Sequence, residues 1–287
     1  MSNDYLCETK LKNENIKLHK LFKESVFCIQ NALNKYQNIF PTYTDHTALH
    51  SLEVIAFCNE LIGKENIDKL NCDEIYVLLM SAYLHDSGMG ITLKDFNTFK
   101  EKIEFGDYFV SHSKDNIPEI IRNFHHEFSG EYIKKYAPLF EIPSKEYVFA
   151  IVQVSRGHRN TDLMDEKEYP SEYKLPNGNT VCLPYLSALI RLADELDIAA
   201  DRNLQFVYDI NKIDNEYSLM EFKKHKAIKK LKIEKDYFYM QVDKSDEKVY
   251  DAVKELRKKL EKTMNYCIDV VNKRTQFTIT QKQILMS

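Results

Sequence analysis

The chain has 287 residues, 44% of them hydrophobic and 29% charged, a balance typical of a soluble globular protein with a sizeable core. Its formal net charge is −4, so no overall basic field favours nucleic-acid binding. Seven glycines and seven prolines are too few for a turn-rich all-β fold, and their scarcity favours long helices.

Periodic apolar residues predict that the chain before residue 204 is mostly helical. The earliest helix is expected over residues 14–37, after which Pro41 interrupts the chain and Thr44 or Asp45 restarts it. Further helices are predicted at 46–62, 73–86, 117–137, 145–157 and 184–200. Of the stretches between them, 160–183 is rich in turns, and 87–116 is a polar connection long enough to be functional or to hold a short helix.

The pattern changes near residue 204. The segments LQFVYDI, YSLMEF, AIKKLKI and YFYMQV read as short strands, and a charged helix is expected over 246–273. We therefore predict a helical domain over residues 1–203 and a small α+β appendage over 204–287. The last helix carries an apolar stripe that must cover either the helical domain or a second copy of the chain. Its length favours a partner, and a homodimer is the simplest closed assembly. The stripe consists of Val249, Val253, Leu256, Leu260, Met264 and Ile268.

No feature of the sequence predicts export or membrane insertion. The first ten residues lack the basic and apolar regions of a signal peptide. No apolar run approaches the roughly 20 residues that a membrane span needs. The six cysteines form no CxxC pair and lie within apolar segments, so neither a zinc-binding motif nor a disulfide framework is predicted. We expect a cytoplasmic protein with no membrane partner.

Several predicted helices carry a histidine or an aspartate where an apolar stripe continues. On the segment 46–62, for example, His50 continues the stripe of Val54, Phe57 and Leu61. Burying one such residue is unremarkable, because a lone inward histidine is usually a hydrogen-bonded core residue. When several histidines and aspartates in one chain continue apolar stripes in this way, a common buried site is favoured. The predicted inward-facing polar residues are His50, His85, Asp86, His126, His158 and Asp194.

Two adjacent histidines compete for the inward position on the segment 117–137. His126 shares a face with Gly130, a small residue that permits close packing. Its neighbour His125 lies on the stripe of Phe128. The small residue favours His126 as the predicted member of the cluster.

Imidazole and carboxylate groups together are the usual ligands of divalent Mn, Fe, Ni, Zn, Co or Mg. A buried carboxylate costs several kcal/mol unless it is paired or bound to a metal. A cluster of four histidines and two aspartates has enough donors for one or two ions, with Asp86 between them. Two such ions generate a hydroxide and hold the oxygens of a phosphoryl group.

The order of these residues resembles the HD-domain superfamily of metal-dependent phosphohydrolases. His50, the doublet His85-Asp86 and Asp194 match its H…HD…D pattern, and HSLEV, AYLHDSGM and LIRLADELD resemble family sequence over residues 43–202. The resemblance implies an all-helical bundle in which His50, His85, Asp86 and Asp194 hold one metal. By similarity to the two-metal branches, His126 and His158 would hold a second metal with bridging Asp86.

Within the superfamily, HHEFSGEYI, RGHRNTDL and LADELDIAADR most resemble HD domains of bacterial proteins that also carry an ATPase module. Because no ATPase module follows here, a free-standing form or a separate ATPase partner is expected. The cyclic-dinucleotide branch has HHExxDGxGYP and the alarmone hydrolases have ED after the doublet. This chain has RGHRNTDLMD and SGMG instead, and neither substrate is supported.

The resemblance implies a hydrolase that cleaves a phosphoester or phosphoanhydride bond, with a nucleotide as the expected substrate, through a metal-bound hydroxide. Asp86 is the central catalytic residue. Arg159, next to His158, is a candidate for bidentate phosphate binding, with a surface ion pair as its alternative. His46, one turn before His50, is a candidate contact for substrate or leaving group, or simply a helix-start residue. Two other functions fit: a dinuclear-iron oxygenase of the inositol-oxygenase type, and a nucleotide-sensing or interaction module without turnover.

Overall fold

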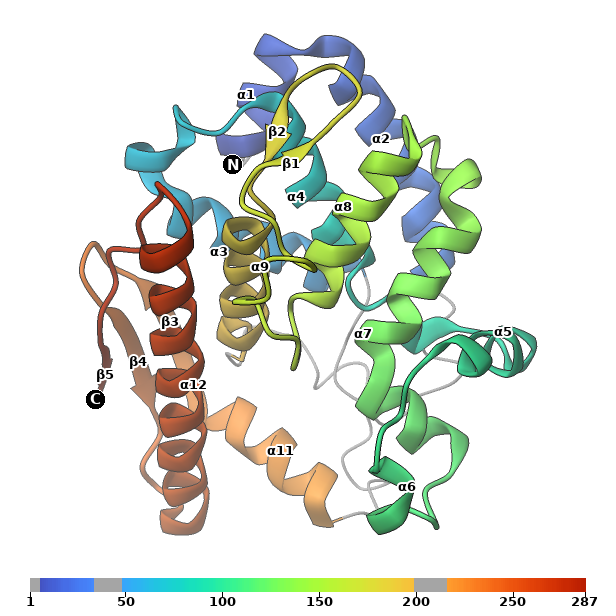
Figure 1. The fold of residues 1–287 in the computed structure, drawn as a ribbon. Helices are drawn as coiled ribbons and strands as arrows, with labels where there is room; N and C mark the ends of the chain where they lie inside the picture. Colours follow the sequence, from blue (N-terminus) through green and yellow to red (C-terminus); the bar gives the residue numbers. More distant parts are fainter. Residues whose placement is uncertain (1–5, 34–47, 199–215) are drawn as a thin grey trace.

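The computed structural model describes residues 6–33, 48–198 and 216–287 and is mainly helical, with a small sheet near the C-terminus (Figure 1). The predicted fold class is confirmed. Among the described residues, no helix has both the length and the apolar character that crossing a membrane requires. The described α-helices before residue 199 are α1 (Leu6–Glu14), α2 (Ile16–Leu33), α3 (Ala48–Ile67), α4 (Cys72–Leu84), α5 (Leu93–Phe99), α6 (Tyr108–Ser111), α7 (Ile117–Tyr136), α8 (Lys145–Arg156) and α9 (Leu183–Leu196).

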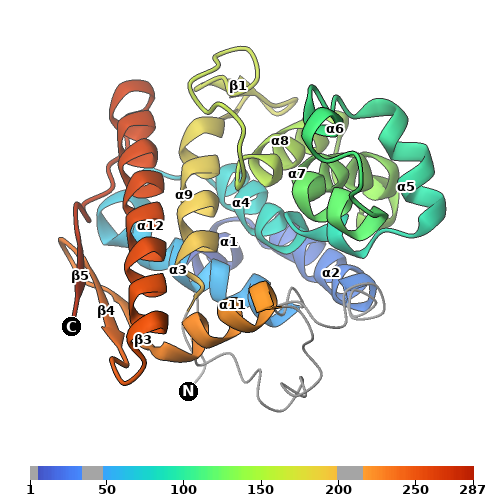
Figure 2. The ribbon, with the colours of Figure 1, turned by 90° about the horizontal axis from the view of Figure 1, so that it is seen from below.

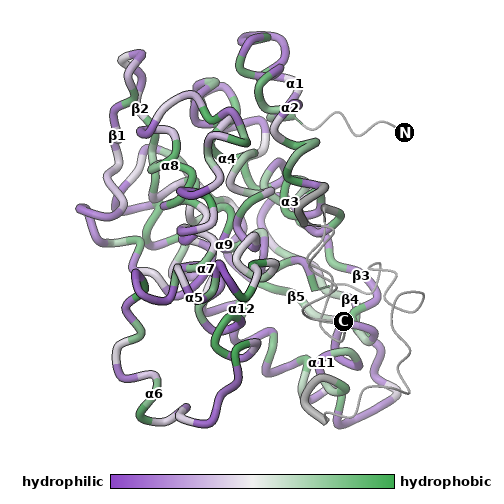
Figure 3. The backbone as a smooth tube through the Cα atoms, turned by 90° about the vertical axis from the view of Figure 1, so that its right-hand side faces the viewer, coloured by the Kyte–Doolittle hydropathy of each residue, from purple (hydrophilic) through white to green (hydrophobic). Residues whose placement is uncertain are grey.

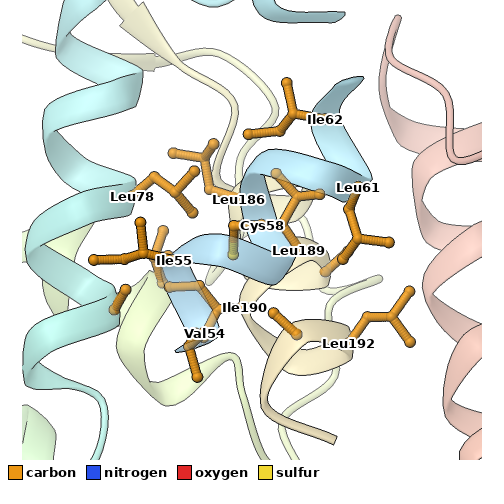
Figure 4. Packing of buried hydrophobic residues seen from close by; sticks show 14 of the residues in the cluster. Val54, Ile55, Cys58, Leu61, Ile62, Leu78, Leu186, Leu189, Ile190 and Leu192 are labelled. Atoms are coloured by element: carbon orange, nitrogen blue, oxygen red, sulfur yellow. The ribbon is translucent and has the colours of Figure 1, made fainter. Parts of the chain in front are cut away.

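Helix α4 is the central helix of the bundle. Every residue of the stretch 73–84 is buried, as expected for a helix that has no polar face. It begins at a capping box formed by Asn71 and Glu74, and it packs against α1, α2, α3, α8 and α9. Figure 4 shows Leu78 of α4 among the side chains of α3 and α9 in the same apolar core. The C-terminal end of α4 therefore reaches the interior, where His85 is fully buried.

The polar connection predicted over 87–116 holds several short helices. They are η2 (Ser87–Gly90), α5, η3 (Lys100–Lys102) and α6, and a further short helix, η4 (Ala137–Phe140), follows α7. Gly88 of η2 lies so close to α7 that a Cβ there would stand 2.3 Å from the carbonyl oxygen of His125 and 2.5 Å from the amide nitrogen of Ser129. The missing side chain thus lets the segment after the doublet rest directly on the α7 backbone.

The turn-rich stretch 160–183 contains the hairpin of β1 (Tyr173–Lys174) and β2 (Thr180–Val181). Near the C-terminus, β3 (Ile228–Ile233) and β4 (Phe238–Val242) confirm two of the predicted strands. β4 also pairs in parallel with β5 (Ile284–Met286), which the sequence analysis did not predict. The resulting sheet has the order β3-β4-β5.

The predicted strand YSLMEF is wrong, because these residues lie in helix α11 (Glu216–Ala227). Six residues of mixed polarity fit either period. The helix is favoured by the Lys224–Glu221 pair three residues apart, by packing on the last helix and by burial of Phe222. The predicted strand LQFVYDI and the predicted domain boundary at residue 203 lie outside the described residues.

The last helix, α12 (Glu247–Arg274), runs beside α9 in Figure 1 and Figure 2 and contacts it. Figure 3 colours the backbone by hydropathy, and hydrophobic and hydrophilic residues are interspersed throughout the described chain. The predicted stripe is covered by the chain itself, since Val253, Leu260 and Met264 are buried in the same apolar core as α3 and α9. The stripe therefore presents no free face to a second copy, and the argument that favoured a homodimer no longer holds.

Candidate metal centre

Five helices bring polar side chains to one place inside the bundle. His50 comes from α3, and His85 and Asp86 follow the last turn of α4. His125 lies on α7, His158 lies just after α8, and the end of α9 supplies two aspartates. All these histidines are buried, and so is Asp86. The donors are thus far apart in the sequence and are assembled only by the fold; they are His50, His85, Asp86, His125, His158, Asp194 and Asp197.

The first donor group consists of His50, His85 and Asp86, with Asp194 at its edge. The Nε2 atoms of the two histidines are 3.1 Å apart, and they lie 3.5 Å and 3.3 Å from Asp86 Oδ2. Asp194 Oδ1 lies 3.2 Å from His50 Nε2 and 3.7 Å from His85 Nε2. The structure therefore brings together all four residues that the resemblance assigned to one metal.

The second donor group consists of Asp86, His125 and His158. The Nε2 atoms of the two histidines are 2.8 Å apart, and they lie 3.3 Å and 3.6 Å from Asp86 Oδ1. Asp86 thus directs one carboxylate oxygen to each group. Atoms that bind one ion at about 2.1 Å are about 3.0–3.5 Å apart, which is close to the spacing in both groups.

The Nδ1 atoms of the four histidines fix which ring nitrogen carries the proton. Those of His85, His125 and His158 lie 2.9, 2.6 and 2.5 Å from the backbone carbonyl oxygens of Ala82, Arg122 and Ser155. That of His50 lies 2.6 Å from Asp197 Oδ2. Carbonyl and carboxylate oxygens only accept, so each Nδ1 donates and each neutral ring keeps a lone pair on Nε2.

Those Nε2 lone pairs face one another and face carboxylate oxygens, an arrangement that is repulsive unless a cation lies among them. A proton or a metal ion can be that cation, and the outward hydrogen bonds from Nδ1 are typical of metal-binding histidines. The buried donor set therefore fits one or two divalent ions.

The histidines of the two groups differ in basicity. Burial lowers the pKa of His125 to about 3 and that of His158 well below its ordinary value, so both rings are neutral at neutral pH. Burial also opposes the charged form of His85, but the charge of Asp86 and contacts with Asp194 raise its pKa to about 9. Without a metal, a proton on His85 thus supplies positive charge to the first group.

His125, not the predicted His126, belongs to the second donor group. On α7, His125 is followed one turn later by Ser129, whose hydroxyl donates to the carbonyl of His85 at 2.5 Å and accepts from the amide of Gly88 at 2.8 Å. The face of α7 that carries His125 and Ser129 therefore contacts the segment of His85 and Asp86. The face of His126 and Gly130 meets α8 instead, since a Cβ on Gly130 would lie 3.2 Å from Arg156 Cδ. The prediction favoured His126 because Gly130 permits close packing, but the close contact with the segment of His85 and Gly88 is made at Ser129.

A model of the HD-CE family matches residues 40–276. The chain belongs to the HD-CE family. No curated protein and no solved structure matches it. The match confirms the resemblance to HD domains. It also shows that the HD-CE region of this chain extends past the predicted boundary at residue 203 and includes α12.

The two other predicted catalytic residues have different outcomes. His46 lies outside the described residues. Arg159 is half-buried and follows His158. Burial is the main cause that lowers the pKa of His125 and His126, and the positive charge of Arg159 lowers both further. Within the described part of the HD-CE chain, its guanidinium makes no hydrogen bond or ion pair, unlike that of Arg156, which holds both oxygens of Glu127 at 2.9 and 2.7 Å.

No role is predicted from sequence for Asp197, although it lies three residues after Asp194, immediately past the end of α9. Its carboxylate accepts the Nδ1 proton of His50 and so orients that ring. The spacing of two aspartates in ADELD was the available signal. A role for Ser129 had no comparable signal, because only the fold shows that η2 rests on α7.

Proposed function

We propose that this HD-CE chain is a metal-dependent phosphohydrolase that cleaves a phosphoester or phosphoanhydride bond, with a nucleotide as the expected substrate class. The observation that carries the proposal is the sharing of Asp86 by two buried donor groups. In this assignment His50, His85, Asp86 and Asp194 hold one divalent ion, and Asp86, His125 and His158 hold the other. Such a pair, when bound, lowers the pKa of a water and neutralises charge on phosphoryl oxygens.

The other residues act on the substrate and on the donors. Arg159 lies beside His158, and its guanidinium has no hydrogen bond or ion pair to any residue that the structure describes, which suits bidentate binding of a phosphate group next to the second donor group. Asp197 holds the His50 ring in one tautomer. His46 stays a predicted contact with substrate or leaving group. A separate ATPase partner stays a prediction that rests on the sequence resemblance alone.

The experiment has two steps. Elemental analysis of the purified protein measures its metal content, and a screen of nucleotides and phosphodiesters with Mn, Mg, Ni and Co measures phosphate release, with Asp86→Asn as the control. We expect release with the wild type and a loss of at least about a hundredfold in the variant, since both groups lose a charged ligand. Iron-dependent oxygen consumption with a polyol would favour the oxygenase instead. Ligand binding without turnover under every condition would favour the sensing module.

A further inference from the structure

The loop that follows α8 carries His158 and Arg159 and is held from outside by polar contacts. The most buried of these comes from Arg191 on α9, which is only 8% exposed. Its Nε donates to the carbonyl of Gly157 at 2.7 Å, and its Nη2 donates to the carbonyl and hydroxyl oxygens of Thr161 at 2.8 and 3.1 Å. One guanidinium thus binds the residue before His158 and a residue three positions after it.

Helix α12 supports this contact from the other side. The guanidinium of Arg191 lies 5.1 Å from the centre of the Tyr266 ring. The Tyr266 hydroxyl accepts from the amide of Leu163 at 2.7 Å and donates to Asp162 at 3.0 Å. Further along α12, Arg274 donates to the carbonyl of Leu163 at 2.7 Å. The loop is therefore fastened to α9 and α12 at several successive residues.

The same loop is tightly packed where it leaves α8. A Cβ on Gly157 would lie 2.5 Å from the Cβ of Ser187 on α9. The loop cannot move toward α9 because of this contact, and the Arg191 hydrogen bonds oppose movement away from it. Between these two constraints, His158 Nδ1 is held by Ser155 and its Nε2 faces Asp86.

We infer that Arg191 is the positioning residue of the second donor group, and that Tyr266 makes α12 part of the metal centre. This rests on the proposed function, because it assumes that the second group binds an ion. Arginine suits the role since its planar fork of donors spans two carbonyl groups, which a lysine ammonium cannot do in the same geometry. The buried charge is balanced by carbonyl dipoles and an aromatic face.

The test measures ion affinity rather than activity. Full-length protein is stripped with a chelator and titrated with Mn²⁺ by calorimetry, in a His50→Ala background that reports the second group and a His158→Ala background that reports the first. In the His50→Ala background we expect Arg191→Met to weaken Mn²⁺ binding by the second group about 10–100-fold, the usual effect of losing an outer partner of a metal ligand. In the His158→Ala background we expect Arg191→Met to leave the Mn²⁺ affinity of the first group unchanged. A merely structural role would weaken both.

Three further variants sharpen the result. Arg191→Lys keeps the charge but not the fork, so it should weaken the second group nearly as much. Tyr266→Phe keeps the ring under Arg191 and removes the hydroxyl, so a smaller loss in the same direction is expected; it carries the test if the Arg191 variants do not fold. Tyr147→Phe removes a buried hydrogen bond to Asp73 away from the loop and should keep both affinities.

Two outcomes overturn different statements. If Arg191→Met and Tyr266→Phe bind Mn²⁺ in the His50→Ala background as tightly as that background alone, the inference is wrong while the metal pair stands. If the wild-type chain itself binds no ion in its second group, the proposed function fails first, and the positioning role fails with it.

Discussion

At the residue scale, Asp86 is the side chain on which both donor groups depend. Its Oδ2 faces His50 and His85, and its Oδ1 faces His125 and His158. The four histidines around it differ in what holds their Nδ1 protons. A backbone carbonyl is fixed by the helix that carries it, whereas the Asp197 carboxylate that holds His50 is a side chain. His50 is therefore the donor whose Nδ1 partner a single substitution can remove.

We predict that Asp197→Ala weakens the first ion about 10–100-fold by freeing the His50 ring, without changing the second. Calorimetric titration of metal-stripped protein with Mn²⁺ measures both affinities. Asp197→Asn is the matched control, since its amide oxygen still accepts the Nδ1 proton, and an intermediate affinity is expected. An unchanged first affinity in Asp197→Ala would show that His50 is oriented by its packing alone.

Adjacent histidines on α7 give a sharper comparison. His125→Ala should remove the second ion, because it removes a ring whose Nε2 lies 3.3 Å from Asp86. His126→Phe should keep both ions, since its Nδ1 is buried without a hydrogen-bond partner among the described residues and its Nε2 lies near Glu127. Metal content by elemental analysis distinguishes the two variants. Loss of an ion in His126→Phe but not in His125→Ala would restore the assignment favoured by sequence alone.

The pKa of about 9 for His85 predicts a pH dependence for the first ion. Below about pH 9 the metal-free His85 holds a proton that an ion must displace, so affinity should rise about tenfold per pH unit toward pH 9. It should level off above pH 9. The second group, with neutral His125 and His158, should show no such rise over this range. Titrations in buffers of different ionisation enthalpy would count the released proton.

At the scale of helices and strands, apolar stripes predicted several metal-donor residues correctly but were less reliable for the choice on α7 and for helix α11. His50, His85 and Asp86 could be found from sequence because each continues the apolar stripe of a predicted helix. The choice between His125 and His126 could not be made this way, since both are buried and the α7 backbone departs from helical geometry at Phe124. Helix α11 was missed because a short segment of mixed polarity fits both periods.

The contact between η2 and α7 can be tested with a pair of glycines. Gly88→Ala should destabilise the protein by about 1–3 kcal/mol or more, because its Cβ meets the α7 backbone, which has little freedom to move. Gly130→Ala should cost less than Gly88→Ala, since its Cβ would meet side-chain atoms rather than backbone, Arg156 Cδ at 3.2 Å and Val152 Cγ1 at 3.3 Å, and alanine favours the helix by up to about 1 kcal/mol. Urea unfolding measures both. Equal changes in the free energy of unfolding for the two variants would mean that η2 can shift away from α7 at little cost.

At the scale of the whole molecule, the stretch predicted as an appendage shares its core with the bundle. One apolar cluster includes Val54 of α3, Ile190 of α9 and Val253 of α12. Sequence could not show this, because a stripe on a helix states that something must cover it but not what. The family match supports the same view, since it includes both sides of residue 203. The independence of 1–203 stays a prediction.

The fastening of the His158 loop by α12 also orders events while the chain is made. Residues 247–274 leave the ribosome long after His158 has been synthesised, and segments emerge in sequence from the N-terminus. The donors of the first group, His50, His85, Asp86 and Asp194, are all synthesised before Tyr266 and Arg274, which fasten the loop. In a nascent chain the first donor group would therefore be complete before the second is fastened, and the proposed metal pair would require α12 to have folded onto the loop.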